Sequence, residues 1–412
     1  MIIKRSLIVT VGTGTRPDVY IVKPLVKTIR DSRPDFLVLI VTDVSRMFGE
    51  SIVKELGIDQ SGFMMESLKD FDDFQAVFRS INRVFRKLDE MGFSPEEIQL
   101  DFTSGTKAMS SGAVLSAIYN QCASIKYITG QRKNGVVIDG TEKFLTVSPS
   151  AVFALHDIQL AHELILRLRF ATADEILGNL KLDLLDKEES RWAKNLRLIS
   201  QAYLAWDTFD HKTAQRKMDK VEWGLSTLKP FKPSSEATTL LRNLVAGDNK
   251  NEFLFLDLFN NAVRRGKEGK YDDAVARFYR ATELFAQQIL AEEPYGINTG
   301  DVDLSLVPDA MRSILERNKS DMDGKIRIGM EMDYKLLSEL GHAVGAHFLE
   351  DKQLRGRLGE RNGSILAHGL SPVSKSLYKK LLSSVLSLFR LEQPDFADRS
   401  REVQFPWLTD GD

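Results

Sequence analysis

Short β-branched runs alternate with longer helical patterns over residues 1–150, and the alternation stops at Pro149. The runs are SLIVTVG (6–12), FLVLIVTD (36–43), IQLDFTSG (98–105) and SIKYITG (124–130), with apolar residues at helical spacing between them. Apolar strands separated by helices are typical of a parallel sheet covered on both faces. We therefore expect a Rossmann-like α/β domain, whose strand order the pattern leaves open. The runs GVVIDG (135–140) and KFLTV (143–147) are expected to form an antiparallel pair.

Beyond Pro149 the periodicity is helical to the end of the chain, with a Pro- and Ser-rich break at 228–239 and an irregular stretch at 292–308. The expected organisation is an α/β domain over 1–150, a helical middle segment over 151–250 and an all-helical domain over 251–412. Two segments, around Ala214 and Ala274, resemble tetratricopeptide helix pairs. They lie too far apart for a tandem repeat of 34 residues, so we interpret them as helical hairpins.

Composition narrows the class of protein. The formal net charge of -2 argues against a surface that binds nucleic acid as a whole through a basic field. Cys122 is the only cysteine, which excludes an internal disulfide and a cysteine-based zinc site. No run approaches the ~20 apolar residues that cross a bilayer. We expect a soluble, cytoplasmic protein without a membrane partner.

The glycine-rich turn after the first run, VGTGTRPD (11–18), does not fit a dinucleotide fingerprint, because Pro17 stands where its third glycine belongs. SGTKAM (104–109) likewise lacks the spacing of a Walker loop. Both turns nevertheless belong to a set of polar loops at the carboxyl ends of the expected strands, where open α/β sheets bind ligands. The candidate ligand-binding residues are Gly12, Thr13, Gly14 and Thr15; Thr42, Asp43 and Ser45; Thr103, Ser104, Gly105, Thr106 and Lys107; and Gln131 and Arg132.

Glycine amides, hydroxyls and a helix start in these loops would suit a phosphate-bearing ligand, with Lys107 and Arg132 supplying charge. Each loop taken alone also fits ordinary capping and turn chemistry. The acidic stretch DFDD (70–73) is interpreted in that way, as the start of a helix.

The segment RNGSILAHG (361–369) carries the second candidate site. Seven positions separate Arg361 from His368, which on a helix would bring both to one face. Arginine binds a phosphodiester through two hydrogen bonds, and histidine transfers protons near neutral pH. Together they suit metal-independent RNA cleavage by an adjacent 2′-hydroxyl, with Asn362 holding the histidine or a phosphate. Without further context such a pair would be surface or capping residues.

A metal site elsewhere is not expected, since His342 and His347 in HAVGAH (342–347) are five positions apart and lack the glutamate of a helical zinc motif. Arg280 and Glu283 are expected to form an ion pair one helical turn apart. His156 and His162 are assigned structural roles in the first helix beyond the sheet.

Two stretches carry a family resemblance. VTVGTGTRPD (9–18) and DFTSGTKAM (101–109) resemble the CARF domain of CRISPR-associated proteins, and the R-N-x5-H spacing from Arg361 to His368 is similar to the HEPN ribonuclease signature. The whole chain resembles the Csm6/Csx1 class of CARF-HEPN ribonucleases, and within it the Cas02710 family. The resemblance implies a homodimer with one composite catalytic cleft, and a cyclic oligoadenylate as allosteric activator seated on Thr13 and residues 103–107.

The expected activity is cleavage of single-stranded RNA in type III CRISPR antiviral defence, leaving 2′,3′-cyclic phosphate and 5′-hydroxyl ends, without a cofactor. Arg361, Asn362 and His368 would be the catalytic residues. Two alternatives stay open: a cyclic-nucleotide-binding regulator whose helical half only docks a partner, and a CARF ring nuclease that degrades its own ligand.

Overall fold

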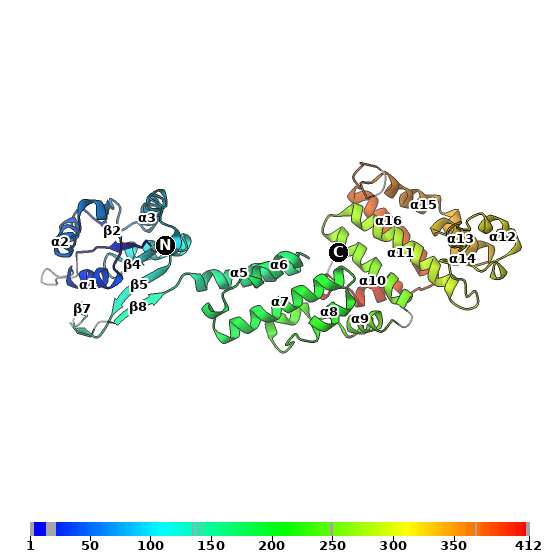
Figure 1. The fold of residues 1–412 in the computed structure, drawn as a ribbon, viewed down its shortest axis with the longest axis horizontal. Coiled ribbons are helices and arrows are strands. Elements are labelled where there is room, and N and C mark those ends of the chain that lie inside the picture. The colour runs from blue at the N-terminus through cyan, green and yellow to red at the C-terminus, as the bar shows by residue number, and fades with distance from the viewer. Residues whose placement is uncertain are drawn as a thin grey trace. The chain divides into compact units, whose positions relative to one another are not determined.

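The computed structural model describes residues 4–13, 22–133, 136–137, 140–141, 143–247, 250–366 and 369–408 (Figure 1). The chain forms two compact units. The first unit extends to Asp157 and includes Lys181–Asp186, and the second contains Ile158–Leu180 and the residues from Lys187 onward. The fold class is α/β followed by all-α, as predicted. The division into three segments at 150 and 250 stays a prediction.

The first unit is built on a six-stranded sheet of order β3-β2-β1-β4-β5-β8. Five strands are parallel, and β8 pairs with β5 in the antiparallel direction at one edge. The order reverses between β1 and β4, which makes their carboxyl ends the topological switch point of the sheet. The strands are β1 (Ser6–Thr10), β2 (Phe36–Val41), β3 (Phe63–Ser67), β4 (Ile98–Asp101), β5 (Ser124–Thr129) and β8 (Lys143–Val147).

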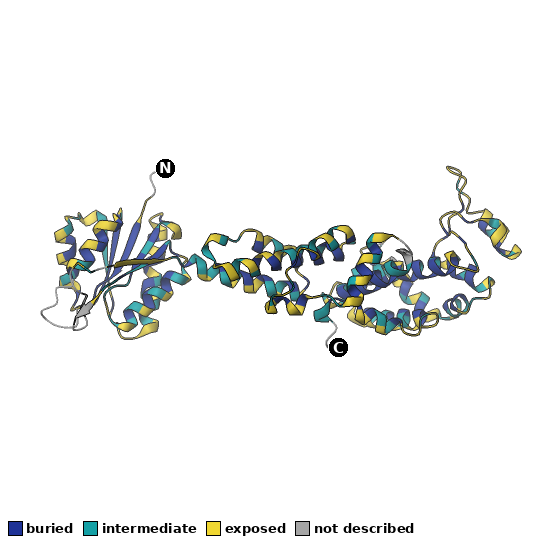
Figure 2. Cartoon of the chain, turned by 90° about the horizontal axis from the view of Figure 1, so that it is seen from below, coloured by how far each residue is buried: buried dark blue, intermediate teal, exposed yellow. Residues whose placement is uncertain are grey.

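Helices cover both faces of this sheet. The helices α1 (Val22–Ser32) and α2 (Arg46–Leu56) pack on one face, whereas α3 (Phe74–Glu90) and α4 (Lys107–Tyr119) pack on the other. The strand side chains alternate between the two cores: Leu37 and Leu39 face α1 and α2, and Val38 and Ile40 face α3 and α4. The central strands β1 and β2 are buried along their whole length, whereas the edge strand β8 is exposed, as are the outer helical faces in Figure 2. Burial on both faces explains the unbroken apolar runs in the sequence.

Two strand predictions were wrong. The run KFLTV does form β8, but its partner is β5; Val136 and Val137 of GVVIDG form β7, which pairs with β6 (Arg132–Lys133). Strand β3 was missed because its sequence, FMMES, has no β-branched residue and no clear alternation.

The regular elements of the second unit are all helices among its described residues, apart from an isolated bridge between Lys319 and Ile326. Its long helices include two hairpins, α7 with α8 and α10 with α11, which confirms the hairpin interpretation. The helices are α5 (Ser150–Leu166), which begins in the first unit, α6 (Phe170–Gly178), α7 (Lys187–Asp207), α8 (His211–Met218), α9 (Ser235–Ala246), α10 (Lys250–Lys267), α11 (Tyr271–Ala291), α12 (Asp309–Glu316), α13 (Met330–Glu339), α14 (Ala343–Glu350), α15 (Lys352–Gly359), α16 (Lys375–Arg390) and α17 (Phe396–Glu402).

Short 3-10 helices lie between these elements in both units. They are η1 (Gln60–Gly62), η2 (Pro95–Glu97), η3 (Leu182–Leu184), η4 (Ser226–Phe231), η5 (Leu304–Leu306), η6 (Glu360–Gly363) and η7 (Pro406–Leu408). None of the helices in the described ranges is long and apolar enough to span a membrane.

A buried charge network centred on Arg264 of α10 joins the middle helices to the C-terminal part of the second unit. Its guanidinium donates to Asp207 at the end of α7 at 2.7 Å and to the Gln404 side chain at 3.0 Å. Asp257 lies 3.4 Å away, and the Phe405 ring lies 4.1 Å below the guanidinium carbon. Because Arg264 is only 1% exposed, loss of both carboxylates would leave a buried charge unpaired.

Candidate functional sites

The carboxyl ends of β1 and β4 meet through glycine backbone at the switch point. The Thr10 hydroxyl donates to the carbonyl of Ser104, and the Gly12 amide donates to the Ser104 hydroxyl at 3.0 Å. A Cβ atom on Gly12 would lie 2.7 Å from the amide nitrogen of Gly105, which itself has a φ of +122°. The two turns therefore approach each other more closely than side chains allow.

In the turn after β4, some residues make hydrogen bonds within the fold and others are exposed to solvent. The Thr103 hydroxyl accepts from the Ile128 amide at 3.0 Å, and Thr106 caps α4 by accepting from the Met109 amide at 3.2 Å. Lys107 is the first residue of α4, and it is exposed beside the exposed Gly105. These two hydroxyls serve the fold, as does that of Ser104, whereas Gly105 and Lys107 are exposed at the carboxyl edge of the sheet.

The turn after β2 is mainly structural. The Thr42 amide donates to the Ser45 hydroxyl at 2.8 Å, the Ser45 amide donates to the Thr42 hydroxyl at 3.1 Å, and both residues are buried. Asp43 is exposed and accepts from the Ser67 hydroxyl at 3.2 Å. Of the predicted set, Asp43 is the residue that this turn presents at the surface.

The remaining predicted residues of the first unit lie at or outside the limits of the described chain. Thr13 and Gln131 are exposed, and the Gln131 amide donates to the Thr141 hydroxyl at 3.1 Å. Arg132 begins β6, but its side chain is not among the described ones, and Gly14 and Thr15 fall outside the described residues. Since β2, β1, β4 and β5 are adjacent and parallel, the structure gathers the described turns along one edge.

Asp101, at the end of β4, was missed as a support of this edge. The residue is fully buried, and its carboxylate accepts from the Thr103 amide at 2.8 Å, which fixes the turn. Burial raises the pKa of Asp101, against the opposing effects of Thr103, Thr28 and Lys126. The sequence signal was an acid inside an otherwise apolar strand, directly before the Thr-Ser-Gly turn.

In the second unit, the expected helix from Arg361 to His368 is wrong. Arg361 lies in the short helix η6, which ends at Gly363, and a bend and a turn follow at Ser364–Leu366. The chain then folds back: the Gly369 amide donates to the carbonyl of Ser364 at 3.2 Å, and the Ser371 amide donates to that of Gly363 at 3.0 Å. Two glycines favour this closed loop over a helix, and a Cβ on Gly369 would lie 2.0 Å from the Gly363 oxygen.

His368 falls outside the described residues, as does the side chain of Asn362. Gly369, directly after the histidine, is described, and its amide donates to the carbonyl of Ser364, three positions beyond Arg361. The loop carries exposed apolar side chains, with Ile365 67% and Leu370 87% exposed.

Arg361 makes a cation–π contact with an aromatic ring. Its guanidinium carbon lies 4.7 Å from the centroid of Tyr279 on α11, and its Nε is buried without a hydrogen-bond partner among the described residues. The next residue of α11, Arg280, donates to Glu283 one turn further on at 2.6 Å, which confirms the predicted ion pair. Tyr279 was missed by the sequence analysis, because an aromatic residue in an amphipathic helix is indistinguishable from a core residue.

An acidic group lies close to this cluster. Asp333 of α13 is fully buried, and neither of its carboxylate oxygens makes a hydrogen bond of good geometry. Burial and the charge of Glu283 raise the pKa of Asp333 to about 7, although Gln287 and Arg280 act in the opposite direction. The same Glu283, after burial, helps to raise the pKa of Tyr279, so its phenol stays protonated near neutral pH.

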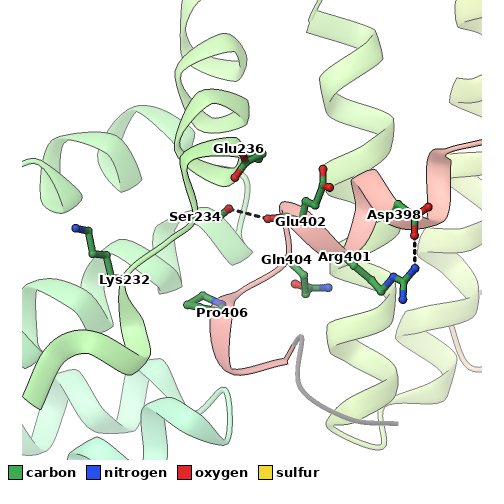
Figure 3. A pocket seen from close by; sticks show the side chains of 8 residues that line it. All are labelled: Lys232, Ser234, Glu236, Asp398, Arg401, Glu402, Gln404 and Pro406. Carbon is green, nitrogen blue, oxygen red and sulfur yellow. Dashed lines mark hydrogen bonds and ion pairs between the residues drawn. The ribbon is translucent and has the colours of Figure 1, made fainter.

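A hollow of about 560 Å³ lies elsewhere in the second unit, between the start of α9 and α17 (Figure 3). Charges of both signs line it, including Lys232 and Glu236, and the Ser234 hydroxyl donates to the carbonyl of Glu402 at 2.6 Å. None of the predicted site residues contributes to it. In the part of the chain that is described, no three His, Cys, Asp or Glu side chains gather as metal ligands. His342 instead caps α14 and lies 3.4 Å from Glu392.

Residues 244–392 match the family model described as the Csm6 HEPN domain, a range that includes Tyr279, Asp333 and Arg361. The structure resembles that of Enterococcus italicus Csm6 bound to cyclic hexa-2′-fluoro-hexa-dAMP, with a TM-score of 0.56 and 12% identity over 98% of this chain and 99% of that one. Can2 from Sulfobacillus thermosulfidooxidans, in complex with cyclic tetra-adenylate, gives a TM-score of only 0.25, with 12% identity over 52% of this chain and 69% of that one. No curated protein matches the sequence.

The first unit has a Rossmann-like fold with its glycine turns at the switch point, and the second contains a HEPN domain. The matched domain is described as the HEPN domain of Csm6, and the fold of the whole chain is similar to that of a Csm6 protein. The chain is therefore Csm6-like, with an α/β unit followed by a helical unit that contains the HEPN match.

Proposed function

We propose that this protein is an endoribonuclease of type III CRISPR antiviral defence that a cyclic oligoadenylate activates. The observation that carries the proposal is the position of Arg361 in η6, within the matched HEPN domain and directly before the closed loop. Its guanidinium lies over the Tyr279 ring and makes no ion pair among the described residues. A guanidinium in that state can bind a phosphodiester through two hydrogen bonds.

The proposed substrate is single-stranded RNA. A flexible strand allows the 2′-hydroxyl to align with the neighbouring phosphorus, whereas a duplex opposes this alignment. Arg361 would stabilise the charge that develops on the phosphate oxygens, and His368 would transfer a proton to or from the reacting oxygens. Asn362 would orient the histidine or a phosphate. The products would carry 2′,3′-cyclic phosphate and 5′-hydroxyl ends, and the protein would need neither metal nor cofactor.

The activator would bind at the edge formed by the turns after β1, β2, β4 and β5. Support comes from the close backbone contact of Gly12 with Gly105 and from the exposed Lys107 at the first turn of α4. Amides and a cation at a helix start are suitable partners for phosphates. Binding would activate the nuclease only if the ligand has a higher affinity for the active arrangement.

We further propose a homodimer in which the loops of two subunits form one cleft. The exposed Ile365, Leu366 and Leu370 beside Arg361 support a contact of this kind, because exposed apolar clusters next to a polar group commonly mark interfaces. Light scattering should then give twice the chain mass of 46.5 kDa. The proposed location is the cytoplasm.

The decisive experiment follows cleavage of a fluorescent single-stranded RNA with cyclic tri-, tetra- and hexa-adenylate, each with and without EDTA. We expect one ring size to activate the protein strongly, EDTA to leave the rate unchanged, and Arg361→Ala and His368→Ala each to reduce the rate at least ~100-fold. Product ends are identified by their response to phosphatase and kinase.

Two results would redirect the proposal. If both variants cleave RNA like the unaltered protein, or if no ligand induces cleavage, the helical half is an interaction domain of a ligand-binding regulator. If the cyclic ligand itself disappears during incubation of the His368→Ala variant, the first unit is a ring nuclease.

A further inference from the structure

Tyr279 stands apart from the other aromatic residues of the second unit. Most of those rings pack on one another in the core, as Phe259, Phe278, Phe389 and Phe396 do. Tyr279 is half-buried, and among the described residues its ring makes no ring–ring contact but lies 4.7 Å from the guanidinium of Arg361. Its side chain therefore supports a charged group and contributes little to the aromatic core.

The Tyr279 ring and the burial of Nε together determine which part of Arg361 is free. A ring beneath the guanidinium covers one of its faces and leaves its edges open to hydrogen-bond acceptors. The Nε edge is buried without a partner among the described residues. The terminal amino groups are then the part of Arg361 that can reach a phosphate.

The position of Tyr279 is itself fixed by its helix. Tyr279 lies in the middle of α11, a helix of 21 residues that packs against α10, α13 and α16. Arg361 belongs to a short 3-10 helix followed by a loop, where its long side chain would otherwise sample many rotamers. A rigid ring can therefore hold a flexible side chain in one orientation.

We propose that the Tyr279 ring is a positioning residue that aligns Arg361 for phosphate binding. This inference rests on the proposed ribonuclease function. The effect belongs to the aromatic face, and the phenolic hydroxyl is not required. Because alignment matters most where charge develops, loss of the ring should reduce kcat more than it raises KM.

The test compares Tyr279→Phe, which keeps the ring, with Tyr279→Leu, which removes it, in the full-length protein with its activator. Tyr271→Leu is the matched control, because Tyr271 is also half-buried on α11 but contacts Tyr378 at 5.5 Å. We expect kcat to fall roughly tenfold in Tyr279→Leu, which corresponds to about 1.4 kcal/mol, and to be restored within about threefold by phenylalanine. The control should stay near the unaltered rate.

A second readout does not depend on activity. In NMR spectra of the full-length protein, the Nε–H and Cδ–H signals of Arg361, assigned with Arg361→Lys, should be shifted upfield by the ring. The shift should persist in Tyr279→Phe and disappear in Tyr279→Leu, and melting temperatures of all variants are recorded beforehand.

The outcomes separate cleanly. An unaltered rate in Tyr279→Leu, or an equal loss in Tyr279→Phe, would overturn the positioning role of the ring. Absence of the upfield shift in the unaltered protein would overturn it as well. If the protein cleaves no RNA under any condition, the proposed function fails, and the NMR shift still decides whether the ring holds Arg361.

Discussion

At the scale of single residues, the buried carboxyl group of Asp333 determines a pH dependence of stability. Its pKa of about 7 in the folded protein exceeds the ordinary value of 3.8, because burial and Glu283 disfavour the ionised form. Folding is therefore opposed by ionisation of Asp333 as the pH rises from about 4, and the cost is complete above pH 7. The full destabilisation of the folded protein is at most ~4 kcal/mol, because each pH unit between the two pKa values costs about 1.4 kcal/mol.

We expect Asp333→Asn to be more stable than the unaltered protein at pH 8, with an advantage that shrinks steadily toward pH 4. Urea unfolding of both proteins across this range measures the difference. Asp309→Asn is the control, because the Asp309 side chain is 89% exposed and pairs only with Arg312 at the surface. Parallel pH profiles for Asp333→Asn and the unaltered protein would contradict the raised pKa.

Residue types were predicted from sequence more successfully than their environments. The glycines and hydroxyls of the first unit were recognisable because they follow apolar strands. Which hydroxyls are already bonded was not recognisable: Thr103 is engaged by the Ile128 amide 25 positions away, a contact that only the β4–β5 pairing creates. The contact of Tyr279 with Arg361 was likewise hidden, since 82 positions separate them in the sequence.

At the scale of elements, the start of α4 places a structural residue next to one with a proposed binding role. Thr106 caps the helix and also donates to the Phe71 carbonyl at 3.0 Å, whereas Lys107 is exposed. Thr106→Val should therefore lower the melting temperature of the first unit, with a loss of about 1–2 kcal/mol in stability. Lys107→Ala should leave the melting temperature unchanged.

For ligand binding we expect the reverse, with a larger effect from Lys107→Ala than from Thr106→Val. Lys107→Ala should weaken binding of a cyclic oligoadenylate at least tenfold, the value of one charged hydrogen bond, measured by calorimetry. Lys54→Ala serves as the control, since Lys54 is an exposed lysine in the last turn of α2. Equal affinities for the Lys107 and Lys54 variants would remove Lys107 from the binding site.

Most elements were predictable because their periodicities are strong, and the exceptions have physical causes. Asp73 caps α3 by accepting from the Gln75 and Ala76 amides, as the DFDD stretch predicted. By contrast, the seven-residue spacing from Arg361 to His368 suggested a helix that Gly363 and Gly369 prevent. Spacing predicts a shared face only where the backbone between the two residues stays regular.

At the scale of the whole molecule, the helices on either side of residue 250 depend on one another. The buried guanidinium of Arg264 needs Asp207, which belongs to α7. A fragment of residues 251–412 would lack this carboxylate and expose the faces of α10 that pack against earlier helices. We expect that fragment to remain unfolded, and a fragment of residues 158–412 to fold.

Circular dichroism melting and the dispersion of amide NMR signals distinguish the two fragments. The longer fragment should unfold in a cooperative transition, whereas the shorter one should show none. The variant Arg264→Ala in the longer fragment should lower the transition strongly, because Asp207 and Asp257 then each lose one of their buried partners. A cooperative transition of residues 251–412 alone would refute this dependence.

The contact between Gly12 and Gly105 has a consequence for selectivity. Neither residue has a side chain, so a molecule lying across the switch point meets main-chain atoms that are the same in any sequence able to keep this approach. Discrimination between rings of different size then falls to the periphery, to groups such as Lys107 and Asp43. Substitutions of Lys107 or Asp43 should therefore change which ring size binds, while the backbone at Gly12 and Gly105 keeps its conformation.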